Sequence, residues 1–525
     1  MPDRGHREHR TSDEGALVNH RTIMRTSGVI ATAAVAGALA LAVGTPATAA
    51  SGINSTALRA AITQDGLMGH LEALQAVADE NGGNRAAGSS GYEASAAYVE
   101  DTLLAAGYTP VRQEFTYEQF ILNDSAFSAD GVTYGDPTDY SPMSYSGSGD
   151  ITATLQAVDV NLAGTRASTS GCEDSDFDSF IAGNIALVQR GSCTFRVKVD
   201  NAAANGASAI VVFNQGNDVP GDDRFGVVFG TLDPPLAAIP AIGTSFAIGE
   251  ALVGAGAVQA RVMVDATTET TDTFNVIADT PTGRDDRTVV IGAHLDSVHE
   301  GPGINDNGTG TATVLETAVQ MAELGIEPRN TVRFAFWGGE EDGLIGSEYY
   351  VSQLSKAQIK QHAVNLNFDM LGSVNAVRFV YDGDGDAFGT TGPNGSDIIE
   401  GVFDDYFASQ GLATEPTEFD GRSDYFAFIN NGIPAGGLFS GAEGLMTPQE
   451  AEDFDGTAGA PYDPCYHQAC DTIDNVDGET LEELADAAAH ATLTFAQTTS
   501  AVNGTAKGKA VGQFDPTFKG HLALR

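Results

Sequence analysis

The hydrophobic and polar positions divide the chain into three zones with different periodicities. Between residues 57 and 107 apolar residues recur every three or four positions, which predicts helices. From about 122 to 270 short apolar runs alternate with Gly-, Asp- and Ser-containing turns, which predicts strands and one helix near 197–205. From 274 to 500 strand-like and helix-like runs alternate strictly. That alternation predicts an α/β fold with a mainly parallel central sheet flanked by helices on both faces.

The first 50 residues predict export. Arg21 and Arg25 precede the uncharged apolar stretch 28–44, and small residues follow at 47–50. This order is typical of a secretory signal peptide, and an Ala- and Gly-rich stretch of this length is short for a membrane anchor, the alternative interpretation. We therefore expect a signal peptide over 1–50 and a secreted, extracellular protein without membrane attachment. At the other end, 501–525 show no clear period and are expected to form a flexible tail.

The net charge of the chain limits the classes of molecule that it can bind. The 525 residues contain 26 Lys and Arg against 71 Asp and Glu, which gives a net charge of −45. Nucleic acids and anionic membranes need positive charge on their partner, so the sequence argues against both. A strongly acidic surface favours solubility and cation binding.

The four cysteines are expected to form disulfides, because oxidised cysteines are usual in exported proteins. Three pairings are formally open. The local pairing, Cys172 with Cys193 and Cys465 with Cys470, is the preferred one. A zinc site built from thiolates is the alternative, but the first pair has no neighbouring Cys-x-x-Cys.

Acidic and imidazole side chains follow the predicted strands of the third zone at the points where those strands end. Active sites of open α/β sheets form at the carboxyl ends of strands, so we expect these groups to converge although they are far apart in sequence. A further imidazole, His467, lies far downstream between two cysteines. The strand-end groups are His294, Asp296, Asp306, Glu340, Glu341 and Asp369.

So many anions in one place predict metal ions. Carboxylates at close range raise one another's pKa unless cations neutralise them. Two divalent metals about 3.5–4 Å apart would do so, with one carboxylate bridging them. Mixed imidazole and carboxylate ligands suit zinc, with manganese or cobalt as alternatives. Of the successive pair Glu340 and Glu341, one residue can bind metal while the other acts as general base, and Asp296 could orient His294. Each residue alone is more often structural; the ordered set favours the site.

These motifs resemble a known family. The segments GAHLDSV, GINDNGTG, FWGGEEDGLIGS, LNFDMLG, GRSDYFAF and CYHQACDT are similar to secreted bacterial di-zinc aminopeptidases of leucine-aminopeptidase type. That family is related to glutamate carboxypeptidases and the transferrin receptor ectodomain. The resemblance covers about 57–120 and 270–500, and implies a zinc-peptidase domain over 51–121 and 271–500. One departure is Asn307, where the family often has Asp.

The resemblance also implies a role for each residue. Glu340 would be the general base, and Tyr466 would polarise the scissile carbonyl. Arg422 would help to position the substrate. Independently of the motifs, the apolar residues Met370 and Phe439 near the predicted site suggest a hydrophobic pocket for the first residue, in keeping with leucine-preferring relatives. The implied metal ligands are His294 and Asp369 for one zinc, Glu341 and His467 for the other, and Asp306 as the bridge.

The middle zone resembles a second family. Gly171-Cys172, the strand 185–189, RGSCTF and GASAIVV are similar to a protease-associated domain. The resemblance implies that 122–270 are a protease-associated domain inserted into the peptidase.

The expected function is that of a secreted metallo-aminopeptidase with two zinc ions, acting as a monomer on peptide or protein N-termini. A carboxypeptidase of the same family would need a basic pocket, for which Arg422 is the obvious candidate. A glutaminyl cyclase-like transferase would typically use one zinc, and a non-catalytic binding ectodomain would be expected to have lost ligands. Calcium binding by Glu482 and Asp486 on the last predicted helix is a further alternative, with a solvated helix face preferred.

Overall fold

The computed structural model describes residues 53–217, 224–232 and 234–504, so the predicted signal peptide and the tail from 505 onward lie outside the described residues. The chain enters through three helices, α1 (Thr56–Arg59), α2 (Gln64–Glu80) and α3 (Ser90–Ala105). Hydroxyl caps start the two longer helices, because the side chains of Thr63 and Ser89 accept hydrogen bonds from backbone N–H groups of the first turn. The predicted helical zone is therefore two long helices separated by a turn.

A twisted sheet forms the centre of the catalytic half. Its strands follow the order β13-β12-β14-β11-β9-β10-β8. The middle strands β14, β11, β9 and β10 are parallel to one another, while β12 and β8 run antiparallel to their neighbours β14 and β10. The predicted mainly parallel sheet is confirmed. Its strands are β8 (Gln259–Asp279), β9 (Arg284–His294), β10 (Asn330–Trp337), β11 (His362–Phe368), β12 (Phe379–Tyr381), β13 (Glu415–Thr417) and β14 (Ala435–Phe439).

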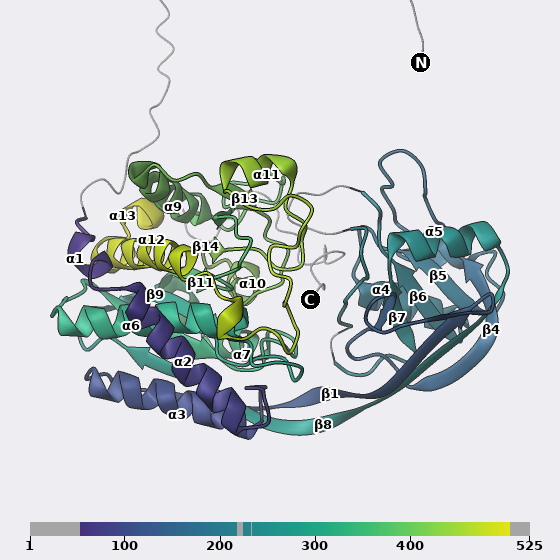
Figure 1. The fold of residues 1–525 in the computed structure, drawn as a ribbon, viewed down its shortest axis with the longest axis horizontal. Coiled ribbons are helices and arrows are strands. Elements are labelled where there is room, and N and C mark those ends of the chain that lie inside the picture. The colour runs from purple at the N-terminus through teal and green to yellow at the C-terminus, as the bar shows by residue number, and fades with distance from the viewer. Residues whose placement is uncertain (1–52, 218–223, 233, 505–525) are drawn as a thin grey trace, which may run out of the picture. The chain divides into compact units, whose positions relative to one another are not determined.

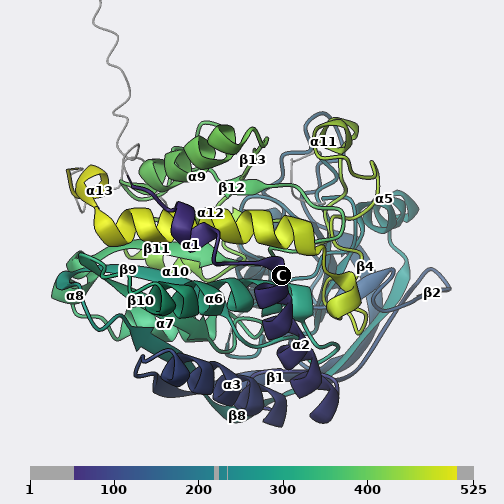
Figure 2. The same cartoon turned by 60° about the vertical axis from the view of Figure 1, so that its left-hand side comes forward.

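Helices cover both faces of this sheet (Figure 2), and each face has its own apolar core. Val289 and Ile291 of β9 point into the larger core with α2, α3, α6 (Gly310–Glu323) and α12 (Gly478–Gln497). Val290 points to the opposite face, against α7 (Ile345–Ser352) and α10 (Tyr425–Asn430). Burial of both faces explains why these strands read as continuous apolar runs. The remaining helices are α8 (Lys356–Gln361), α9 (Ser396–Gln410), α11 (Pro448–Asp453), α13 (Ser500–Gly504) and the short turn η3 (Ile473–Asn475).

Two long strands lead out of the sheet to the inserted unit (Figure 1). β1 (Val111–Ala129) pairs with β8 from Val111 opposite Ile277 to Ala129 opposite Ala260. β1 continues through the mixed polar and apolar residues 118–124, because its pairing with β8 extends over that whole length. Inside the unit β4, β5, β6 and β7 are parallel, and Cys172 is bonded to Cys193. Its elements are β2 (Val132–Tyr134), β3 (Tyr140–Pro142), β4 (Gly149–Ala157), η1 (Asp174–Phe177), β5 (Ile185–Gln189), α4 (Phe195–Ala204), β6 (Ala209–Phe213), β7 (Ala241–Thr244) and α5 (Phe246–Ala255).

Over the residues that the structure describes, each helix is too short or too polar to cross a bilayer.

The inserted unit buries a lysine in its core. Lys198 on α4 has no exposed surface, and its ammonium donates a hydrogen bond of 2.6 Å to the carbonyl of Ser170. Burial lowers the pKa of Lys198 to about 7, because the charged form loses its hydration. In the unfolded chain this pKa returns to its ordinary value, so between pH 7 and 10 the unfolded chain binds more protons than the folded one. The free energy of unfolding therefore increases with pH over this range.

We predict that Lys198→Met changes the pH dependence of stability. Between pH 7 and 9 the wild-type protein should gain up to about 1.4 kcal/mol of unfolding free energy per pH unit relative to the variant, which lacks the titrating group. Denaturant titrations of both proteins at pH 7 and pH 9 measure the difference. A difference that does not change with pH would contradict the prediction.

Candidate metal centre and active site

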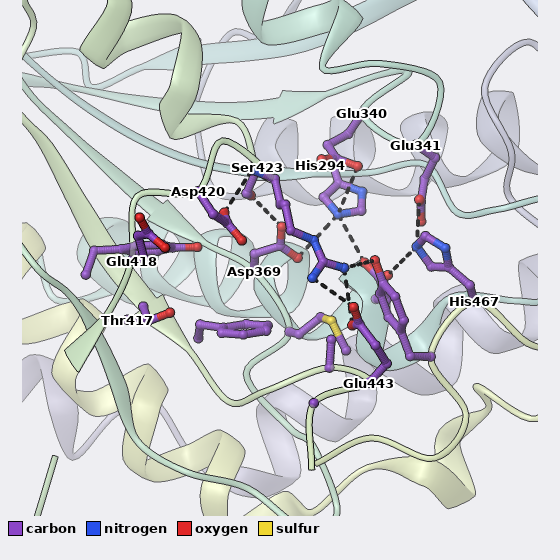
Figure 3. Close-up of a pocket in the computed structure, with 18 residues that line it drawn as sticks. His294, Glu340, Glu341, Asp369, Thr417, Glu418, Asp420, Ser423, Glu443 and His467 are labelled. Atoms are coloured by element: carbon purple, nitrogen blue, oxygen red, sulfur yellow. Dashed lines mark hydrogen bonds and ion pairs between the residues drawn. The ribbon is translucent and has the colours of Figure 1, made fainter. Parts of the chain in front are cut away.

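The predicted groups converge at the carboxyl ends of the parallel strands (Figure 3). His294 is the last residue of β9, Glu340 and Glu341 follow β10, and Asp369 follows β11. Asp306 lies in the turn η2 (Ile304–Thr309) that leads into α6. His467 comes from the loop before α12 and lines the same cavity. The structure thus brings together every residue that the sequence singles out as a metal ligand.

Asp306 stands between the two imidazoles. Its Oδ1 lies 3.2 Å from Nε2 of His294, and its Oδ2 lies 3.2 Å from Nε2 of His467. The remaining carboxylates divide between the same two imidazoles. Oδ1 of Asp369 is 3.3 Å from Nε2 of His294, and Oε2 of Glu341 is 3.1 Å from Nε2 of His467. The groups therefore form two clusters that share Asp306.

These separations fit metal ions. Two ligand atoms about 2.0–2.1 Å from one tetrahedral zinc stand roughly 3.3 Å apart, close to the four spacings above. Two oxygens also lack another partner, since Oε1 of Glu341 and Oδ1 of Asp369 are buried without a hydrogen bond. A buried carboxylate oxygen left in this way is costly unless a cation accepts it. The donor set and its free oxygens therefore suit a pair of divalent cations.

Burial and neighbouring charges shift the pKa values of the clustered carboxylates. Burial opposes ionisation of Asp306, but the neighbouring imidazoles outweigh it and hold the pKa of Asp306 well below its ordinary value. Glu341 is shifted the other way: burial, with help from Asp306, raises its pKa to about 7. The cluster cannot keep all its negative charge without positive charge beside it.

Backbone groups fix the carboxylates and the loops that carry them. The carboxylate of Asp296 accepts hydrogen bonds of 3.2 Å from the N–H groups of both Glu340 and Glu341. The sequence suggests that Asp296 orients His294, and Nδ1 of His294 does lie 3.2 Å from Asp296, but from its carbonyl oxygen; the carboxylate is 3.8 Å away. Asp296 therefore contacts the imidazole through its main chain and the glutamate loop through its side chain.

Three residues that support the site were not predicted from the sequence. The hydroxyl of Ser423 donates a 2.5 Å hydrogen bond to Oδ2 of Asp369. Asp471 accepts the backbone N–H groups of Asn305 and Asp306 at 2.8 and 3.0 Å. Ser423 lies inside the GRSDY segment and Asp471 directly follows Cys470, so both adjoin motif residues. The third, Arg85, stands far from every motif, and its sequence context gives no signal.

The loop that carries His467 is closed by a disulfide between Cys465 and Cys470. His467 itself has a left-handed backbone conformation, with φ of 56°. The ring of the preceding Tyr466 stacks on the imidazole with centroids 3.8 Å apart. The bridge therefore spans the two residues that this loop contributes to the cavity.

The predicted substrate residues also line the cavity. Met370 follows Asp369, Phe439 ends β14, and Arg422 lies before α10. Tyr381 at the end of β12 adds a second ring to the wall. The cavity lining thus includes apolar and aromatic side chains beside the clustered carboxylates and imidazoles, together with further polar residues such as Glu418 and Asp420.

The chain is similar to known peptidases. Residues 275–492 match peptidase family M28, and residues 151–252 match the PA domain. An aminopeptidase of Pseudomonas aeruginosa is 45% identical over 438 residues, which cover 82% of this chain and 81% of that protein. A probable leucine aminopeptidase 2 of Aspergillus fumigatus is 40% identical over 422 residues, 80% of each chain.

Solved structures of aminopeptidases are similar to this fold. The aminopeptidase from Aneurinibacillus sp. strain AM-1 superposes with a TM-score of 0.64 at 26% identity, covering 83% of this chain and 95% of that one. A zinc aminopeptidase from Bacillus subtilis gives a TM-score of 0.57 at 25% identity, covering 85% and 96%.

Arg85 ties together the loop that runs from His294 toward Asp306. Its guanidinium is fully buried and donates to the carbonyls of Leu295, Pro302 (2.8 Å) and Gly303 (2.6 Å). Burial lowers the pKa of Arg85 to about 10, and nearby carboxylates, Asp296 first among them, act against that shift. The side chain thus supplies both hydrogen bonds and positive charge beneath the metal-binding cluster.

We predict that Arg85→Met lowers the free energy of unfolding by roughly 3 kcal/mol or more, because three carbonyls and the nearby carboxylates lose a buried cation. Arg85→Lys is the matched control. It keeps the charge but cannot span the three carbonyls with one ammonium, so its loss should be smaller. Denaturant unfolding measures both, and equal losses would show that charge plays no part.

Proposed function

This chain belongs to peptidase family M28, and from that membership and the geometry of its cavity we propose that it removes N-terminal residues from peptides with the help of two zinc ions. It is an aminopeptidase with an inserted PA domain. We place the boundaries of the insertion at 122–270, and those of the peptidase domain at 51–121 and 271–500. Residues 501–525 are proposed to be a tail.

The observation that carries the proposal is the position of Asp306 between two imidazoles. We assign Asp306 as the bridging ligand, His294 and Asp369 as ligands of one zinc, and Glu341 and His467 as ligands of the other. Zinc is favoured by the mixed donor set and by the zinc aminopeptidase among the similar structures. When bound, the ions supply Lewis acidity toward the scissile carbonyl and lower the pKa of water.

Glu340 is proposed as the general base. Its Oε2 is 4.0 Å from Nε2 of His294, farther than the carboxylate oxygens assigned as ligands, so it stands beside the cluster. There it can take the proton of the attacking water and pass it to the leaving amine. Tyr466 lines the same cavity, where its hydroxyl can donate a hydrogen bond to the oxygen that becomes negative.

The cavity favours an N-terminal over a C-terminal substrate end. A free α-amine is positively charged and finds carboxylates around it. A C-terminal carboxylate would need an available cation, but the one arginine among the lining residues, Arg422, is ion-paired with Glu443 at 2.9 Å. Met370, Phe439 and Tyr381 offer apolar contacts, so we propose a preference for a hydrophobic first residue.

The wider setting is also proposed from the sequence. The signal-like start and the two disulfides support secretion. We further propose that the enzyme is a monomer that acts on peptide or protein N-termini outside the cell. Calcium binding by Glu482 and Asp486 stays a prediction. Asp486 already lies 3.4 Å from Arg59.

We predict that activity depends on two metal ions per chain. Dialysis against a chelator should abolish release of p-nitroaniline from leucine p-nitroanilide, and zinc should restore it. Elemental analysis of the active enzyme should give about two zinc ions per chain. N-acetyl-leucine p-nitroanilide is the control and should not be hydrolysed. Turnover of the blocked substrate, or activity that survives metal removal, would overturn the proposal.

A second prediction separates the two successive glutamates. Glu340→Gln should lower turnover by on the order of 10²–10⁴ with two zinc ions retained, because a general base is lost and no ligand. Glu341→Gln, the matched control, should lose zinc as well as rate. Zinc content and single-substrate kinetics of both variants test this. Loss of metal in Glu340→Gln alone would show that the roles are reversed.

A further inference from the structure

Arg422 is an isolated positive side chain on the cavity wall. Among the described residues that line the cavity, it is the one lysine or arginine, and it shares that lining with the carboxylates of the cluster. A guanidinium at this place is suited to bind a carboxylate with two parallel hydrogen bonds. Whether it does so for a ligand depends on what already occupies its donors.

Glu443 occupies them. Oε1 of Glu443 lies 2.9 Å from Nη1 of Arg422, and Nη2 donates to Oε2 of Glu443 at 3.2 Å. Figure 3 labels Glu443 among the residues that line the cavity. Burial alone would lower the pKa of Arg422, but Glu443 and other anions outweigh it and raise the pKa well above its ordinary value. The pair is therefore an intramolecular arginine–carboxylate pair inside the active-site cavity.

The guanidinium also adjoins the proposed position of the reacting carbonyl. Nη2 of Arg422 donates to the hydroxyl of Tyr466 at 3.3 Å. If Tyr466 contacts the scissile carbonyl, as proposed above, Arg422 lies one hydrogen bond away from the atom where hydrolysis creates a carboxylate. The substrate has a neutral amide at that place, whereas the released amino acid has an anion.

We propose that Glu443 determines how weakly the enzyme holds its amino-acid product. Glu443 satisfies both arms of Arg422, so the carboxylate of the released residue has to compete with a tethered carboxylate already in place. Glu443 also repels that second anion. Peptide substrates, which carry an amide there, gain no such contact and meet no such repulsion. The inference rests on the proposed aminopeptidase function and adds the residue that limits product inhibition.

The test compares two inhibitors of the zinc-loaded enzyme that differ by the carboxylate alone. Leucine has the amine, the side chain and the carboxylate, while 3-methylbutylamine has the first two. In Glu443→Gln, which keeps the shape and removes the charge, the inhibition constant of leucine should fall about tenfold or more. The constant of 3-methylbutylamine should change less than about twofold. Glu443→Asp, which keeps the charge, should retain a leucine-to-amine ratio near that of the wild type.

The proposal is supported if the inhibition constant of leucine alone falls in Glu443→Gln and this fall is absent from the double variant Arg422→Gln, Glu443→Gln. Equal changes for both inhibitors, or no change, overturn it. Glu443→Ala removes the charge independently and must give the same selectivity if Glu443→Gln is too unstable to assay. Hydrolysis of leucine p-nitroanilide by the wild type tests the proposed function separately, because that rate does not depend on the ratio of inhibition constants.

Discussion

The concentration of negative charge at one edge of the sheet is the constraint on which the rest of the site depends. Asp306 and Glu340 are each 5% exposed and Asp369 is 8% exposed, and Asp296 is fully buried beneath them. Burying carboxylates this close together is unfavourable unless cations balance them. The protein supplies part of that balance in Arg85, and the two imidazoles supply donor atoms for the rest. The cluster is therefore suited to bind divalent cations.

Residues outside the cluster have to orient its side chains before a metal ion binds. Backbone N–H groups serve this purpose at both ends of the site: Asp296 accepts them from the glutamate loop, and Asp471 accepts them from the turn that carries Asp306. Ser423 fixes Asp369. Because these partners come from different strands and loops, the ligand geometry depends on the assembled sheet rather than on any one segment. Such support orients ligands and limits the reorganisation that metal binding requires.

The strands and the ligands could be predicted because both leave local signals. A buried parallel strand is an apolar run, and a polar residue at its carboxyl end has to lie at the sheet edge, which explains why His294, Asp369 and the proposed base Glu340 could be expected to meet there. The supporting residues leave no such signal. Arg85 meets residues 295–303 only through the tertiary fold, and neighbouring positions do not reveal that its side chain is buried. Glu443 likewise pairs with Arg422 across a sequence gap of 21 residues. The sequence identifies Arg422 without indicating that its charge is already matched.

The same dependence on assembly links the catalytic loop to the inserted PA domain. Asp342 directly follows the two active-site glutamates, and its carboxylate accepts hydrogen bonds from Tyr117 (2.5 Å) and Gln119 (3.0 Å) on β1. The hydroxyl of Tyr145, in the inserted unit between β3 and β4, donates to the carbonyl of Asp342 at 3.3 Å. The segment that carries Glu340 and Glu341 is thus held from below by Asp296 and from the outer end by the strand that leads into the insertion. The inserted unit therefore contributes one hydrogen bond, from Tyr145, to the support of the segment that carries Glu340 and Glu341, beside the two that come from β1.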